Sequence, residues 1–238
     1  MLNLALTAVQ SALTNIEIGG TPLVEKYGGL VFPIAIPQEV GKTDGGESIL
    51  KQKVFPVACG VTFQDCVTNR KYQQLVPDSK YKSLVYWEQL GDATLNATLS
   101  QFAPKGGLLV YDIPARLIAW LNIAKLNVNG DGDADCSIVA PVALKIQTAL
   151  YRKNGFTVPN EAYQGAKVQL IFNGQEKKDA ANVFGRYTYG NEVARFMLYP
   201  YDFFSLRYTI RLSINRNCVE AFTLGTQIDC ALGVQSES

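Results

Sequence analysis

Apolar residues recur along the N-terminal segment with the spacing of a helix. They form a seam whose members alternate by four and three positions, which places them on one helix face: Leu2, Leu6, Val9, Leu13 and Ile16. The opposite face is polar and carries no charge before Glu17. Because a solvated helix face usually carries charges, two interpretations stay open. The helix either packs on the core alone or also contacts a neighbouring subunit.

Apolar and polar residues alternate strictly over residues 207–215, which is the period of a half-buried strand. One face of this predicted strand is apolar, and the other carries Arg207 and Arg211. Shorter apolar runs predict further strands at 54–62, 84–87 and 108–111, with a Gly-rich loop at 41–47. The pattern is typical of a sheet built mainly from antiparallel strands.

One internal helix is expected near residues 114–126. Pro114 is suited to a first helical turn, and Leu117, Ile118 and Leu121 follow at helical spacing. Residues 137–150 are predicted to begin extended, with Pro141 after the apolar run. The sequence therefore predicts an α+β fold, antiparallel and β-dominated, with this one internal helix. An N-terminal helix and extended arm (1–48) would precede a single β-rich domain (49–238).

The composition disfavours enzymatic catalysis, metal binding by histidine, nucleic-acid binding and membrane insertion. The chain has 238 residues and no histidine, which removes the usual general base and the commonest metal ligand. Lys and Arg together number 22 and Asp and Glu 21, so the net charge of +1 disfavours nucleic-acid binding as the main function. No apolar run is long enough to cross a bilayer. We expect a protein that is not an enzyme, needs no cofactor and binds no membrane.

An acidic loop at residues 127–135 is the candidate ligand site. It resembles the first half of a calcium loop, with oxygen-bearing side chains at alternate positions: Asn127, Asn129, Asp131, Asp133 and Asp135. Position twelve of such a loop should be a carboxylate, and here it is Ile138. A solvated turn rich in Asn, Gly and Asp explains the same residues. Calcium is the single cofactor that the sequence suggests.

Aromatic residues and arginines are interleaved between residues 186 and 211. Tyr and Arg are enriched at protein interfaces because they bury area and keep hydrogen-bonding capacity. Tyr199, Tyr201 and Phe203 are therefore predicted to join the N-terminal seam in an oligomer interface. The five cysteines are scattered and form no Cys-x-x-Cys pair, which is typical of free thiols in a reducing cytoplasm.

The segments Ile16–Gly20 (IEIGG) and Leu23–Gly29 (LVEKYGG) resemble the start of neck or ring components of tailed bacteriophages, including crAss-like phages. The resemblance covers about the first 40 residues and brings no functional residue with it. It implies a structural protein of the virion, made in the host cytoplasm, that forms a closed ring between portal and tail. Its partners would be copies of itself and other virion proteins. DNA would pass through without sequence-specific binding.

In such a ring, one heterologous interface repeats until the rotation closes. Arg207 and Arg211 would then be possible lumen-facing residues. Two other hypotheses stay open. One is a calcium-dependent binding module centred on the acidic loop, and the other is a histidine-free hydrolase that uses a pair of carboxylates. The sequence does not identify such a pair.

Overall fold

A computed structural model gives the fold of the chain, and it describes residues 2–42, 44, 46–58, 73–101, 107–126, 138–159, 166–176, 179–188 and 195–215. Strands dominate this part of the chain, and helices are few. The predicted α+β class with mainly antiparallel strands is confirmed.

The elements follow one another as a mixture of short and very long segments. The helices are α1 (Leu2–Thr14), α2 (Ile123–Leu126), α3 (Val139–Leu150) and α4 (Ala180–Phe184), with a 3-10 turn at Arg195–Met197. The strands are β1 (Glu17–Ile18), β2 (Thr21–Pro22), β3 (Lys26–Lys42), β4 (Ser48–Ala58), β5 (Gln73–Gln74), β6 (Ser83–Gln89), β7 (Thr94–Leu95), β8 (Leu108–Asn122), β9 (Phe156–Thr157), β10 (Lys167–Gln175) and β11 (Tyr201–Asn215).

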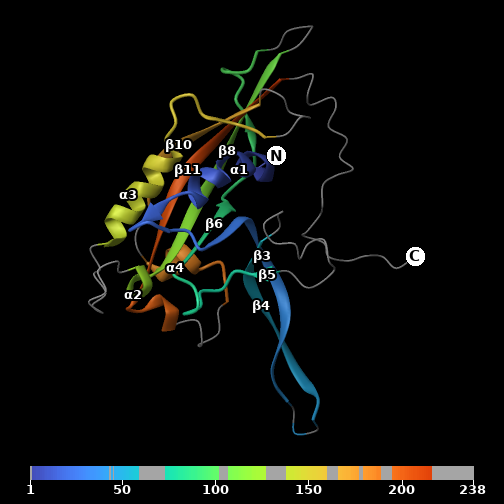
Figure 1. The fold of residues 1–238 in the computed structure, drawn as a ribbon. Coiled ribbons are helices and arrows are strands. Elements are labelled where there is room, and N and C mark those ends of the chain that lie inside the picture. The colour runs from blue at the N-terminus through green and yellow to red at the C-terminus, as the bar shows by residue number, and fades with distance from the viewer. Residues whose placement is uncertain are drawn as a thin grey trace.

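One large sheet organises the described chain. Its strands lie in the order β5-β4-β3-β6-β8-β11-β10-β9, with β7 paired to β8, and a separate two-stranded ribbon joins β1 and β2. The β3–β6 pair is parallel, and the other pairs of the large sheet are antiparallel. Strands β8 and β11 form its centre and run side by side over their whole length (Figure 1).

The predicted helix at 114–126 is wrong: this segment is most of strand β8, and helix α2 covers only its end. The run from Leu117 to Leu121 is fully buried on both faces of the sheet, so polar residues do not alternate with apolar ones there. A continuous apolar run has no strand period, and its i, i+3, i+4 positions imitate a helix. Pro114 lies where the pairing with β6 has ended and that with β7 has not begun, which suits a residue without an N–H.

The reverse error occurs at 137–150, where the sequence predicts an extended start. Residues Val139–Leu150 form helix α3. Pro141 lies in its first turn, where a missing N–H breaks no helical hydrogen bond. Val142, Ile146 and Leu150 recur every four residues and are buried. This seam, and not the β-branched start of the segment, decides its conformation.

Helices α1 and α3 cover one face of the sheet (Figure 1). None of the predicted seam residues of α1 is more than 8% exposed, and all of them belong to the main core. That core also takes alternate residues of the central strands, such as Trp87, Leu117 and Phe204. The seam therefore packs inside its own chain and offers no exposed surface to a neighbouring subunit.

The other face of the sheet holds a second, smaller core around Tyr86, Ile118 and Trp120. It is covered by α4 and the segment after it, including Phe184 and Tyr187. Both faces of β6 and of the second half of β8 are thus buried, which explains the continuous apolar runs at 84–87 and 117–121.

The expected boundary at residues 48/49 coincides with the first residue of β4. Strand β4 pairs with β3 along nearly its whole length, and α1 packs against β3. The two regions expected as 1–48 and 49–238 therefore share one sheet and one core. What leaves the body is the outer part of the β3–β4 hairpin, residues 36–42 and 48–53, called the arm below (Figure 1).

Candidate functional site

The arginine face of β11 is located as the sequence predicted. Tyr208, Ile210 and Leu212 are buried under α1 and α3, and Arg207 and Arg211 lie on the opposite face of the strand. The Arg207 side chain is 57% exposed and that of Arg211 is 25% exposed. Both positions are accessible, but both guanidinium groups are paired.

Each of these arginines binds a carboxylate on a neighbouring strand or at its end. Arg211 makes a bidentate pair with Asp112 of β8, with Nε–Oδ1 at 2.8 Å and Nη2–Oδ2 at 2.9 Å. Arg207 donates from Nε to Oε1 of Glu176, which follows β10, at 2.7 Å. These two ion pairs therefore add little net charge to this face.

A third arginine, Arg116, lies at the centre of this face and is not singled out by the sequence pattern. The register places it opposite Arg207 of β11 on one side and opposite Glu88 of β6 on the other. Its guanidinium donates to Glu88 Oε2 at 2.8 Å, to Glu176 Oε2 at 2.9 Å and to the Val183 carbonyl at 3.0 Å. Glu176 therefore forms ion pairs with two arginines that the register brings together.

Glu88 connects the covering segment to the sheet. Its side chain is 1% exposed, and its second oxygen, Oε1, accepts a hydrogen bond from the Tyr187 hydroxyl. Arg186 lies 3.8 Å from its other oxygen. A carboxylate so enclosed holds α4 and the following turn on the sheet. It is not open to a substrate, so Glu88 and Glu176 do not form an accessible carboxylate pair of the kind that a hydrolase needs.

One sequence signal could have revealed this network. Glu88 and Arg116 each interrupt an otherwise apolar run, after Trp87 and before Leu117. A charged residue within a buried run needs a partner of opposite charge. The identity of the partner depends on strand register, which the sequence does not state.

Two carboxyl groups at this face, those of Asp112 and Glu176, have lowered pKa values. For Asp112, the hydrogen bond from Arg211 is the main cause of the lowered pKa. For Glu176, burial acts to raise the pKa, but hydrogen bonds and positive charge at the carboxylate, those of Arg116 included, outweigh it. A carboxyl group whose pKa is lower in the folded than in the unfolded chain stabilises the fold at pH values above its unfolded pKa.

We expect the free energy of unfolding to fall as the pH decreases from about 5 to about 3, because unfolded carboxyl groups titrate near pH 4. Urea unfolding of the wild type and of Glu176→Gln at a series of pH values measures the contribution of Glu176. The stability difference should be largest near neutral pH and shrink as the wild-type carboxylate becomes protonated. A difference that stays constant over this range would contradict the expectation.

The predicted aromatic interface residues have three different environments. Phe203 is 6% exposed and packs edge-on against Phe184 in the second core. Tyr201 is half-buried and stacks on Trp120. Tyr199 is 66% exposed, next to the equally open Leu198. Of the predicted set, Tyr199 alone presents most of its side chain to the surroundings.

The candidate calcium ligands at 127–135 and the five cysteines lie outside the described residues, so the calcium hypothesis stays a prediction. Within the described ranges, no group of three or more Cys, Asp and Glu side chains is placed to hold a metal ion.

Prolines in the arm and in the part of β3 just before it protect one backbone edge of the hairpin. Pro33 lies opposite Pro56, and because neither has an N–H, this pair cannot be a hydrogen-bonded one. By alternation, Pro33, Ala35 and Pro37 direct their backbone groups away from β4. Past Val31 that edge has no neighbouring strand in the described structure, and two of these three positions lack a donor. Strand addition along this edge is therefore disfavoured.

The base of the arm is clamped on its other edge. Val54 exchanges two hydrogen bonds with Thr188: its N–H donates to the threonine Oγ1 at 2.6 Å, and its carbonyl accepts from the threonine N–H at 2.9 Å. The carbonyl of Pro56 accepts from the Leu75 N–H at 2.8 Å. These bonds fix the direction in which the arm leaves the body.

Comparison with known proteins finds no protein-family model that matches the chain and no curated protein with significant sequence similarity to it. Among the described helices, none has the length and apolar character needed to span a membrane.

Proposed function

We propose that the chain is a structural component of a viral particle, which repeats one interface to form a closed ring in the neck between portal and tail. The observation that carries the proposal is the arm. It continues the β3–β4 hairpin beyond the body, and β3 has no other strand neighbour there in the described structure.

An isolated two-stranded ribbon is marginal in water, because one pair of strands buries little apolar area. At about 3.3 Å per residue, the arm reaches about 20 Å from its base. Its described side chains are mostly exposed, and Ile49 is 41% exposed. Contact with a neighbouring copy would bury this surface and stabilise the ribbon.

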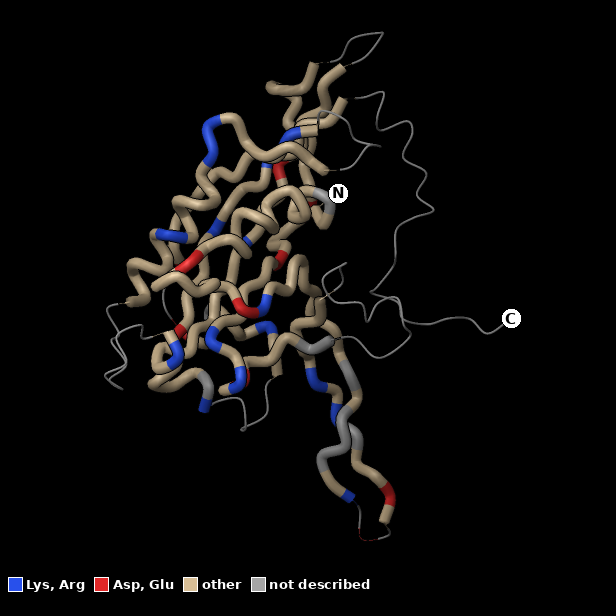
Figure 2. Tube along the Cα trace, in the orientation of Figure 1, with Lys and Arg blue, Asp and Glu red and all other residues tan. Residues whose placement is uncertain are grey.

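The chemistry of the arm favours contact through side chains. Pro33 and Pro37 obstruct the pairing of a further strand, so the arm does not grow into a longer sheet. Lys42 lies at the outer end of the arm, and Lys51 and Lys53 lie nearer the body. Figure 2 shows basic positions toward both ends of the arm. A body at one end and an arm at the other make two different contact surfaces, which is what a heterologous, ring-forming interface requires.

The paired arginines are compatible with DNA that passes without being held. Arg207 and Arg211 are neutralised by Glu176 and Asp112, and the whole chain carries a net charge of only +1. Strong binding to the phosphate backbone of DNA needs several Lys or Arg side chains that are not already paired with carboxylates. A nearly neutral lining would let DNA slide past.

The size and symmetry of the native assembly test the proposal. Mass photometry over a range of concentrations, followed by electron microscopy of the largest species, should show closed rings with one copy of the chain per repeat. Recovery of a strict monomer at every concentration, together with its absence from purified particles, would contradict the proposal.

A further inference from the structure

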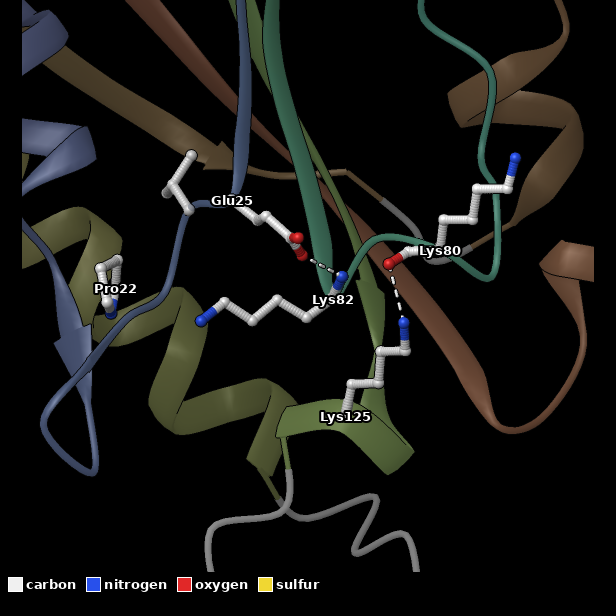
Figure 3. Close-up of a pocket in the computed structure, with 6 residues that line it drawn as sticks. Pro22, Glu25, Lys80, Lys82 and Lys125 are labelled. Atoms are coloured by element: carbon white, nitrogen blue, oxygen red, sulfur yellow. Dashed lines mark hydrogen bonds between the residues drawn. The ribbon is translucent and has the colours of Figure 1, made fainter.

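A pocket lined by lysines lies at the end of the body where β6 begins. Its lining comes from four separate parts of the fold: β2, the β2–β3 connection, the turn before β6 and α2. The lining residues are Pro22, Val24, Glu25, Lys80, Lys82 and Lys125, around a volume of about 580 Å³ (Figure 3). This set is called the lysine pocket below. Pockets of this size hold small molecules or a few groups of a larger ligand.

Hydrogen bonds hold the wall on the side of the β2–β3 connection. The Lys82 N–H donates to Glu25 Oε2 at 2.6 Å. The Ser83 hydroxyl accepts from the Glu25 N–H at 2.9 Å and donates to the Leu23 carbonyl at 2.6 Å. The connection is thereby tied to the first residues of β6.

The wall on the other side is held by α2 and the end of β8. The Lys125 ammonium donates to the Lys80 carbonyl at 2.7 Å, and the Asn122 N–H donates to the Lys82 carbonyl at 2.8 Å. The lysine pocket is therefore built from anchored backbone on both sides, and is not a gap between loose loops.

The charge of the lining is unbalanced. The lining contains three lysines and a single carboxylate, and one oxygen of that carboxylate already accepts a backbone N–H. In Figure 3 the Lys82 side chain crosses the space between Glu25 and Pro22, and its ammonium makes no hydrogen bond or ion pair within the described residues. The Lys125 ammonium uses one of its three protons on the Lys80 carbonyl. The Lys80 side chain points away from the other labelled residues, so Lys80 contributes its backbone carbonyl to the site (Figure 3).

We propose that the lysine pocket binds the phosphate groups of an anionic ligand. Lysine ammonium groups bind phosphate as point charges and need no fixed fork geometry. Lys82 would supply the main contact and Lys125 a second one, while Pro22 and Val24 form an apolar wall beside them. The phosphate can come from a free compound or from a nucleic-acid backbone. The site does not depend on ring formation, since the isolated chain contains every lining residue.

Binding of two phosphate probes to the full chain at low salt tests the proposal: tripolyphosphate by calorimetry, and a labelled twelve-residue thymidine oligonucleotide by fluorescence anisotropy. The double variant Lys82→Glu/Lys125→Glu should weaken binding at least tenfold. For the oligonucleotide, the slope of log K against log salt should decrease by about 0.7 for each phosphate that the variant no longer neutralises. Lys153→Glu is the matched control, because Lys153 is exposed in the turn after α3 and lies outside the lining.

Each outcome decides the question. Tight binding of tripolyphosphate indicates a free phosphate compound, and binding of the oligonucleotide alone indicates a nucleic-acid backbone; either supports the site. The proposal is overturned if neither probe binds, if Lys153→Glu weakens binding as much as the double variant, or if polyglutamate binds as tightly as both probes. Circular dichroism checks folding, and if the double variant is unfolded, the milder Lys82→Gln is expected to weaken binding by several-fold. Neither change touches the arm, so ring assembly is unaffected by this test.

Discussion

Replacing Arg116 by methionine is expected to lower the free energy of unfolding by about 3–5 kcal/mol, the usual cost of removing one partner from a buried ion pair. Arg116 is 4% exposed and holds Glu88 and Glu176 together. Without it, the Glu88 carboxylate stays buried with no close cation among the described residues except Arg186 at 3.8 Å. The total stability of a domain is about 5–15 kcal/mol, so this loss is a large fraction of it. Urea unfolding at neutral pH measures the change.

Two further variants separate the buried charge from the loss of a side chain. Arg211→Met breaks the ion pair with Asp112, in which the Arg211 side chain is 25% exposed and the Asp112 side chain 21%. Because this pair is partly solvated, its loss should lower the free energy of unfolding by about 1 kcal/mol or less. The double variant Arg116→Met/Glu88→Gln should be more stable than Arg116→Met alone, because no unpaired charge then remains at position 88. The amide oxygen of the new glutamine can still accept the Tyr187 hydroxyl. If Arg116→Met costs no more than Arg211→Met, the network has no special role in stability.

Shortening the arm is expected to abolish ring assembly and leave the body folded. The change replaces residues 37–52 by Asn-Gly, so that a two-residue turn joins Ile36 to Lys53. These two residues are register partners, and their pair is of the hydrogen-bonded kind that a type I′ turn closes. The clamp between Val54 and Thr188 is retained. Mass photometry of the shortened chain should show monomers under conditions in which the wild type forms rings.

The body should tolerate this change because none of the removed residues whose burial the structure describes belongs to either buried core. Circular dichroism and the unfolding midpoint should stay close to those of the wild type, which separates the loss of an interface from the loss of folding. Lys153→Glu, on the body and outside the arm, is the assembly control. Rings of unchanged size from the shortened chain would show that the arm is not part of the interface.

Local sequence pattern predicts those elements that bury one face only. The seam of α1 and the alternation in β11 are correct because each element contacts the core on one side and a polar environment on the other. The start of β8 is predicted correctly at 108–111, but its second half is mistaken for a helix, because α1 and α3 bury one of its faces and α4 the other. Apolar and polar residues do not alternate in a strand that is buried on both faces. The length of the apolar segment and the position of Pro114 then wrongly indicate a helix.

The sequence indicates that buried ion pairs exist, but it does not indicate which residues form them. A charge within an apolar run, as at Glu88 or Arg116, signals a buried ion pair. The partner Glu176 is 60 residues from Arg116 and is brought there by the pairing of β10 with β11. The lysine pocket is even harder to predict from the sequence, because Pro22, Lys82 and Lys125 come from separate segments that share no sequence pattern.

By itself, the amino-acid order determined the mixed, strand-rich class, the helix at the start, the basic outer side of β11 and the absence of histidine chemistry. These properties depend on neighbours within a few positions, where side-chain spacing acts directly. Tertiary structure alone decided which strand lies in the middle, where the hairpin leaves the body, which charges neutralise each other and where lysines gather. Those outcomes depend on strand register and layer order, which arise from packing between residues far apart along the chain.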